Sequence, residues 1–277
     1  MKNRFKHGNP ITHILLLVIG FLWCYPFLWM IAASFKTNKE FFSSKLSIIP
    51  ENFSFENFTR VWREAHFNEY FLNTVIITVC TVVIVLVMSQ MAGYVIGRYK
   101  FVGRKALVAI FISSISIPLV STIIPIYQII KNLGLVGTRA GVIISGAGGA
   151  HVIFLLLFSS FYQQIPKELT DASCIDGCNF PQTYFYVMRP LANPIAITTI
   201  IMESMWTWNS FLLPLTLTLN NPSSRTLAVG LYAFKGENTI DWTGIATGAT
   251  ISVVPILLVF ILLQRYFVDG VAGAVKN

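Results

Sequence analysis

Long uncharged apolar runs alternate with short polar segments along the whole chain. Five runs carry no charged side chain, and a sixth is interrupted only by Glu203. As a helix rising about 1.5 Å per residue, each run is long enough to cross about 30 Å of hydrocarbon. Lipid offers a bare backbone amide no partner, so such spans must be helical. We therefore predict an all-α membrane protein with six transmembrane helices, at about residues 14–35, 71–97, 106–130, 141–163, 191–218 and 242–264.

The first apolar run follows Lys2, Arg4 and Lys6, as the core of a secretory signal peptide would. The run is 22 residues long, however, and no A-x-A cleavage pattern ends it. Apolar signal cores are about 7–15 residues. We expect the run to stay as an anchor, within one membrane domain that spans residues 1–277.

The lysine and arginine residues between the apolar runs predict how the chain is oriented in the membrane. Four of the eight residues 98–105 are basic, whereas residues 36–70 spread five basic residues over 35 and balance them with five glutamates. We therefore place 98–105 and both termini in the cytosol. Residues 36–70 then lie outside, and their aromatic residues predict short interfacial helices there.

The amino-acid composition excludes most classes of soluble protein. Apolar residues make up 55% and charged residues 12% of the chain, against about 45–50% and about 25% in ordinary globular domains. Basic residues at inner membrane edges account for the net charge of +8 without a nucleic-acid partner. We find no P-loop pattern for ATP, no set of side chains placed for catalysis, and no His or Cys near Cys174 and Cys178 that would complete a metal site. The chain is predicted not to be an enzyme.

A polar and aromatic loop, residues 164–190, separates the fourth and fifth runs. Pro166 suits the first turn of a helix that we expect over residues 167–176. Glu168 and Asp171 lie early in that helix, where acids interact favourably with its dipole. Gly177 follows as a C-terminal cap, free to adopt a positive φ.

A second short helix is predicted after Asn179, with Pro181 in its first turn. Its apolar side chains recur at helical spacing on one face: Phe180, Tyr184, Val187 and Met188. Two such helices, rimmed with acid, suit insertion into a groove on a cytosolic partner. The alternative is an amphipathic turn on the membrane surface, although such turns usually carry basic faces.

Residues 171–177 resemble the EAA loop of binding-protein-dependent ABC importer permeases, whose core reads E-A-A-x-x-x-G. Here Asp171-Ala172-Ser173 is followed by Gly177. Three further stretches resemble motifs of the same family, in order: 92–104, 208–215 and 264–276. The last two are typical of the carbohydrate-uptake branch, specifically the maltose-type second permease. The resemblance covers almost the whole chain.

The resemblance implies a type I ABC importer permease fold in a bacterial inner membrane. In such importers the EAA loop is a coupling helix that sits in a cleft on a cytosolic ATPase. ATP closes the ATPase dimer and turns the permease pair outward, and hydrolysis resets it. The implied partners are a second permease subunit, a dimeric ATPase that binds ATP and Mg, and an extracellular solute-binding protein. No cofactor is implied for the chain itself.

Site residues can be carried over from the family position by position. Asp171 stands where the family usually has Glu, and Ser173 stands where it has the second Ala. The tail is implied to reach the ATPase through Gly273, Val275 and Lys276, the alternative being a frayed end. The coupling residues implied in the loop are Glu168, Asp171, Ala172, Ser173, Ile175, Asp176 and Gly177.

Glu203 is predicted to lie roughly 18 Å deep in the fifth span. A charge there costs on the order of 3 kcal/mol unless it is paired with another polar group or faces a water-filled cavity. One helical face carries Thr199, Glu203, Trp206, Thr207 and Ser210. Sugars present hydroxyls for polar groups and apolar faces for rings. We therefore predict a substrate path for an oligosaccharide or related sugar along Glu203, Trp206, Thr207, Ser210, Asn209 and His151.

Several alternatives stay open at this point. Glu203 can instead pair with the partner permease or with a polar neighbour in the bundle. Trp208 and Asn209 can serve helix packing, and His151 is better explained as packed or cavity-lining than as a proton relay. The solute can be a non-sugar or a sugar-phosphate ester. A secondary carrier would show repeated halves around an ion site, and the sequence shows one intramembrane acid and no repeat.

Overall fold

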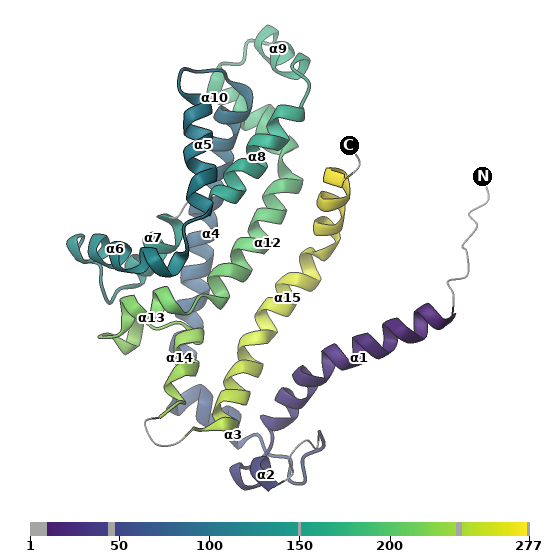
Figure 1. The fold of residues 1–277 in the computed structure, drawn as a ribbon, viewed down its shortest axis with the longest axis vertical. Coiled ribbons are helices and arrows are strands. Elements are labelled where there is room, and N and C mark those ends of the chain that lie inside the picture. Colours follow the sequence, from purple (N-terminus) through teal and green to yellow (C-terminus); the bar gives the residue numbers. More distant parts are fainter. Residues whose placement is uncertain (1–9, 44–47, 149–150, 237–239, 276–277) are drawn as a thin grey trace. The chain divides into compact units, whose positions relative to one another are not determined.

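The computed structural model describes residues 10–43, 48–148, 151–236 and 240–275, and within them regular structure is helical (Figure 1). An isolated bridge between Lys235 and Ile240 is the exception among these residues. The predicted all-α class is confirmed. Three helices are long and apolar enough to span a membrane: α1 (Pro10–Ala33), α4 (Phe67–Arg98) and α15 (Trp242–Val275).

The third and fourth predicted spans are bent rather than continuous. Residues 106–130 are divided between α5 (Arg104–Ile115) and α6 (Leu119–Asn132), which are bent by 107°. Pro118 lacks an N–H and disfavours a helical conformation for the residue before it, which explains where α5 ends. Residues 141–163 are divided between α7 (Arg139–Gly148) and α8 (Val152–Gln164), bent by 48°.

The fifth predicted span, 191–218, is also interrupted. α12 (Asn193–Asn209) ends at an extended Ser210, and α13 (Leu212–Thr218) begins two residues later. Pro214 lies in the first turn of α13, so the carbonyl of Ser210 has no helical partner there. A third bent pair joins Phe180–Leu191 to α12 at 72°. The described residues hold up to six spans if each bent pair counts as one.

The chain forms two compact units. Unit 1 comprises Met1–Asn68 with Gly230–Val253, and unit 2 comprises Glu69–Val229 with Val254–Asn277. In unit 1 the predicted outer segment forms short helices, α2 (Asn38–Ser43), α3 (Glu56–Thr59) and a π-helical turn, η1 (Arg60–Glu64). Aromatic rings from this segment pack around Phe35, whose ring is stacked on Phe53 at 4.3 Å between centroids.

An ion pair between Arg60 and Asp241 ties the outer segment to the residue that precedes α15. Burial raises the pKa of Asp241, but hydrogen bonds from Arg60 and from the Gly244 amide, together with the Arg60 charge, outweigh burial and hold the pKa below its ordinary value. Because the folded-state pKa is depressed, the pair stabilises unit 1 at neutral pH. This stabilisation is lost only as the pH falls through the ordinary value and then through the lower folded-state pKa.

In unit 2, α4 packs closely on α8 at two glycines one turn apart. A Cβ built on Gly93 would lie 2.5 Å from the Cβ of Phe158, and one built on Gly97 would lie 2.7 Å from the carbonyl oxygen of Ser159. Small residues four apart allow two membrane helices to approach at backbone distance. The remaining short elements of unit 2 are α9 (Glu168–Ile175), α10 (Phe180–Gln182), η2 (Thr183–Met188), α11 (Arg189–Leu191), η3 (Pro222–Ser224) and α14 (Leu227–Ala233).

Substituting Gly97 with valine is expected to lower the amount of folded protein in the membrane. The added atoms meet the α8 backbone, which cannot move aside as a flexible side chain would, and overpacking of this kind costs about 1–3 kcal/mol. The measurement is the monodisperse fraction after detergent extraction. Gly20→Val is the matched control, because a Cβ at Gly20 meets nothing within 4 Å. Equal yields of the two variants would contradict the prediction.

Candidate functional site

The polar loop forms the predicted helix and turn at one end of unit 2. α9 ends at a Schellman turn in which the Gly177 amide donates to the Cys174 carbonyl at 3.1 Å and the Cys178 amide donates to the Ser173 carbonyl at 2.9 Å. Gly177 has a φ of 82°, a conformation that side chains with a Cβ rarely adopt. The predicted cap at Gly177 is therefore confirmed. In Figure 1, α9 and α10 lie at the same end of unit 2 as the connection from α4 to α5.

Asn179 caps the second short helix, as predicted, and forms a capping box with Gln182. The Asn179 side chain accepts from the Gln182 amide at 3.0 Å, and the Gln182 side chain accepts from the Asn179 amide at 2.9 Å. The predicted apolar face of this helix is only partly buried, since Phe180 is 50% exposed. Tyr184 and Met188 are buried in a cluster with Tyr94 and Tyr162. α4 and α8 cover Tyr184 and Met188, so these two side chains are not available to a partner, and the insertion of the two helices into a partner's groove stays a prediction.

α9 carries part of the exposed surface of the loop, and Phe180, Phe185 and Tyr186 beyond it are also at least 50% exposed. Ile175 is 86% exposed and Leu169 is 41% exposed, and the acids and Ala172 implied in coupling are exposed with them: Glu168, Asp171, Ala172 and Asp176. An exposed apolar pair rimmed by acids is the arrangement of a docking surface. The coupling residues that the resemblance implies lie on α9 and at its C-terminal end, and their docking on a partner stays a prediction.

Ser173 differs from the other coupling residues that the resemblance implies. It is 4% exposed, its hydroxyl donates to the Thr170 carbonyl at 2.7 Å, and it lies 3.1 Å from the Thr183 hydroxyl. The side chain holds α9 against η2 and does not face outward. In the tail, Gly273 and Val275 belong to the last turn of α15, and Lys276 lies outside the described residues.

A cavity of about 1320 Å³ in unit 2 lies where three helix interruptions meet. Its lining includes Ile117 between α5 and α6, His151 between α7 and α8, and Ser210 between α12 and α13. At membrane depth, irregular backbone is tolerated where it is buried in protein or lines a cavity. The lining is mostly apolar, and among the described residues that form it none is Lys or Arg and the one acid is Glu203.

Glu203 meets two polar partners inside this cavity wall. Its side chain is 1% exposed, and one carboxylate oxygen accepts a hydrogen bond from the Thr207 hydroxyl at 2.8 Å. The other oxygen lies 3.4 Å from Nε2 of His151, a contact that becomes an ion pair when the histidine is protonated. The His151 ring also stacks on Trp206, with centroids 5.3 Å apart. Sequence reasoning named these four residues but not the His151–Glu203 contact, because the two lie 52 positions apart.

The cavity includes all six predicted substrate-path residues but not all of the predicted polar face. Glu203, Trp206, Thr207, Asn209, Ser210 and His151 all line it. Thr199, one turn before Glu203, is fully buried and is not part of the lining. Trp208 is buried, and its ring lies edge-on to the ring of Phe71 with the centroids 6.0 Å apart. This agrees with the interpretation that Trp208 serves helix packing. Asn209 lines the cavity while its side-chain amide donates to the Met205 carbonyl.

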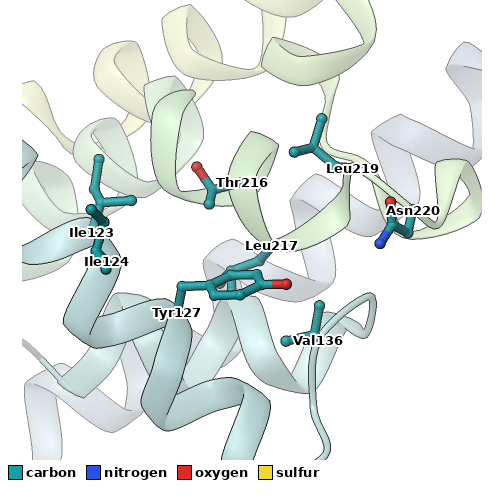
Figure 2. A pocket seen from close by; sticks show the side chains of 8 residues that line it. All are labelled: Ile123, Ile124, Tyr127, Val136, Thr216, Leu217, Leu219 and Asn220. Carbon is teal, nitrogen blue, oxygen red and sulfur yellow. The ribbon is translucent and has the colours of Figure 1, made fainter.

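A smaller pocket of about 240 Å³ lies beside α6 and α13 (Figure 2). The Tyr127 ring from α6 packs with Leu217 of α13 and with Val136. The Asn221 side chain donates to the Gly137 carbonyl at 2.8 Å, and the Gly137 amide donates to the Leu217 carbonyl at 2.8 Å. These contacts attach α6 to α13, and so hold two walls of the large cavity together.

Comparison with known proteins places this architecture in a family. The sequence model of one protein family, the binding-protein-dependent transport system inner membrane component, matches residues 89–273. These residues include both the α9 loop and the cavity residues His151 and Glu203. The chain belongs to this family. The permease is also 31% identical, over 96% of its length and 87% of that protein's, to the diacetylchitobiose uptake system permease protein NgcG of Streptomyces coelicolor. It is 31% identical to the melibiose/raffinose/stachyose import permease protein MelC of Bacillus subtilis, over 99% of both chains.

A solved structure shares the fold of the permease. A chain from a bacterial ABC transporter involved in the import of the acidic polysaccharide alginate matches with a TM-score of 0.82. The match covers 96% of the permease and 99% of that chain at 21% sequence identity. The predicted ABC importer permease fold is confirmed by this likeness.

Proposed function

We propose that the chain is one permease subunit of an ATP-driven importer that carries a neutral oligosaccharide into the cytosol of a bacterium. Relatives over nearly the whole chain are named for uptake of diacetylchitobiose and of melibiose, raffinose and stachyose. The partners in this proposal are a second permease subunit, a dimeric ATPase that binds ATP and Mg, and an extracellular solute-binding protein. The permease acts as one membrane domain with both termini in the cytosol.

The exposed surface of α9 is the observation that carries the coupling part of the proposal. Ile175 and Leu169 are exposed between acids, whereas Tyr184 and Met188 of the neighbouring η2 are buried. In this proposal Ile175 enters a cleft on the ATPase, and Asp171 and Asp176 face basic side chains at its rim. Gly273, Val275 and Lys276 approach the same subunit. ATP binding and hydrolysis then move α9 with the ATPase.

The composition of the cavity supports a neutral sugar over a sugar-phosphate ester. Arginine and lysine are the side chains that bind phosphate, and none of the described lining residues is either. Glu203 would repel an anion, but it accepts hydrogen bonds from sugar hydroxyls. The Trp206 ring is 40% exposed and offers an apolar face on which the C–H side of a sugar ring packs. Thr207, Ser210 and Asn209 supply further polar groups.

Site-directed cross-linking tests the docking of α9. In the assembled transporter, with native cysteines replaced by alanine, Ile175→Cys is expected to cross-link to the ATPase. Ser173→Cys is the matched control, because this side chain is buried against Thr183. Cross-linking at Ser173 but not at Ile175 would contradict the proposed docking face.

Stimulation of ATP hydrolysis tests the substrate class. The transporter, reconstituted with its binding protein, is assayed with neutral di- to tetrasaccharides, with uronate oligosaccharides and with phosphorylated sugars. We expect stimulation by a neutral oligosaccharide and none by the anionic ligands. Stimulation by a phosphorylated sugar alone would replace the proposed substrate class and leave the importer assignment intact.

A further inference from the structure

Arg98, the last residue of α4, contacts the two helices that flank the start of the polar loop. Its Nη1 donates to the carbonyl of Ile165 and, at 3.3 Å, to that of Tyr162. Its Nη2 donates to the Pro166 carbonyl at 3.2 Å and to the Thr170 hydroxyl. The same guanidinium therefore bonds to the end of α8, to the connection after it, and to the first turn of α9.

The position suits an arginine for physical reasons. The last carbonyls of a helix have no intrahelical partner and attract a cation. A guanidinium presents five N–H donors in a rigid fork, so it can bond to both sides of the α8–α9 connection at once, which the compact ammonium of lysine cannot do. The close approach of α4 and α8 at Gly97 places Arg98 within reach of that connection.

α8 extends from this contact toward the cavity. The helix has 13 residues, with His151 as its N-cap. His151 lines the cavity and lies 3.4 Å from the Glu203 carboxylate. At about 1.5 Å per residue, α8 is a rigid connection of roughly 20 Å between the Arg98 contacts and the His151–Glu203 pair.

We propose that Arg98 is a positioning residue that makes α9 move together with α4 and α8, so that displacement of α9 by the ATPase reaches the cavity wall. The inference rests on the proposed function, in which α9 docks on the ATPase. Without the guanidinium, the three residues Ile165–Lys167 remain as the chain connection from α8 to α9, and the Ser173–Thr183 contact remains between α9 and η2. Motion of α9 is then partly absorbed by rotation within this connection, and less of it is transmitted.

Accessibility of the cavity provides the readout. The assembled transporter is reconstituted in nanodiscs, with native cysteines replaced by alanine and with Ser210→Cys in the cavity wall. The rate of labelling by a water-soluble maleimide is measured with and without ATP and vanadate. With Arg98 in place, nucleotide is expected to change the rate. In Arg98→Gln the nucleotide effect is expected to shrink at least about fivefold, the lower end of typical coupling, while assembly and basal ATP hydrolysis persist.

Three further variants separate positioning from folding. Arg104→Gln is the matched control, because Arg104 donates to the Ile96 carbonyl of α4 at 2.7 Å, and its effect is expected to be small. Thr170→Val removes only the α9 end of the contact and is expected to weaken the nucleotide effect. The double variant Arg98→Gln/Thr170→Val is expected to be no worse than Arg98→Gln alone, since both remove the same contact.

A full nucleotide effect in Arg98→Gln, or an equal loss in Arg104→Gln, overturns the inference. If Arg98→Gln fails to assemble, Thr170→Val decides: a weakened nucleotide effect supports the inference and an unchanged one overturns it. Loss of the Ile175→Cys cross-link in the otherwise unaltered transporter would instead refute the proposed docking. A retained cross-link with normal coupling in Arg98→Gln refutes the positioning role alone.

Discussion

Replacement of Gly177 with valine is expected to lower ATP-driven uptake about tenfold or more. Gly177 closes the Schellman turn with a φ of 82°, and a β-branched residue held in such a conformation costs about 1–3 kcal/mol. The chain relieves this strain by moving the turn, which shifts α9 away from η2. Because every 1.4 kcal/mol corresponds to a tenfold change in an equilibrium, even a partial shift depopulates the coupled geometry. The measurement is uptake per assembled transporter, with the rate of ATP hydrolysis recorded in parallel.

Two control variants make this prediction specific. Gly177→Asn is expected to retain most uptake, because asparagine tolerates the left-handed conformation. Gly103→Val introduces comparable strain elsewhere, since Gly103 has a φ of 86° and a Cβ there meets nothing within 4 Å. Normal uptake in Gly177→Val would refute a coupling role for this turn. Equal losses in Gly177→Val and Gly103→Val would assign the effect to folding.

Substitution of Glu203 with alanine is expected to lower uptake more than it lowers the amount of transporter in the membrane. The carboxylate bonds to Thr207 and lies beside His151 in the cavity wall. Hydrogen bonds to a charged group contribute about 1.5–3 kcal/mol, so losing those made to a passing sugar slows uptake about tenfold or more. The measurement is uptake of the oligosaccharide that stimulates ATP hydrolysis most, normalised to abundance by immunoblot.

Glu203→Gln and Thr199→Val separate the contributions of this site. Glutamine keeps the size and one acceptor of Glu203, so an intermediate loss is expected if the carboxylate binds sugar hydroxyls. Thr199 is buried one turn away and does not line the cavity, so Thr199→Val is expected to leave uptake per transporter unchanged. A parallel fall of uptake and abundance in Glu203→Ala would favour a purely structural role for the carboxylate.

Features that depend on neighbours along the chain were predicted from sequence. The apolar runs, the helix 167–176, the Gly177 cap and the Asn179 cap each follow from hydrophobic length or from local backbone preferences. The structure reproduces the helix and the two caps in the described residues, with small shifts at the ends. The interruptions within spans were missed, because hydrophobic length does not distinguish one straight helix from two bent ones. Pro118 and Pro214 were local signals that would have located two of them.

Contacts between distant segments required the tertiary structure. The second short helix of the loop was predicted to have an apolar face, but spacing alone reveals only that a helix face is apolar, not which element covers it. The fourfold contact of Arg98, the inward turn of Ser173 and the His151–Glu203 pair join residues between 10 and 72 positions apart. The sequence by itself determined the membrane class, the family and the turn at Gly177, since these depend on local pattern. Packing decided which surface of α9 is free and which side chains meet in the cavity, because burial depends on neighbours that only the folded chain brings together.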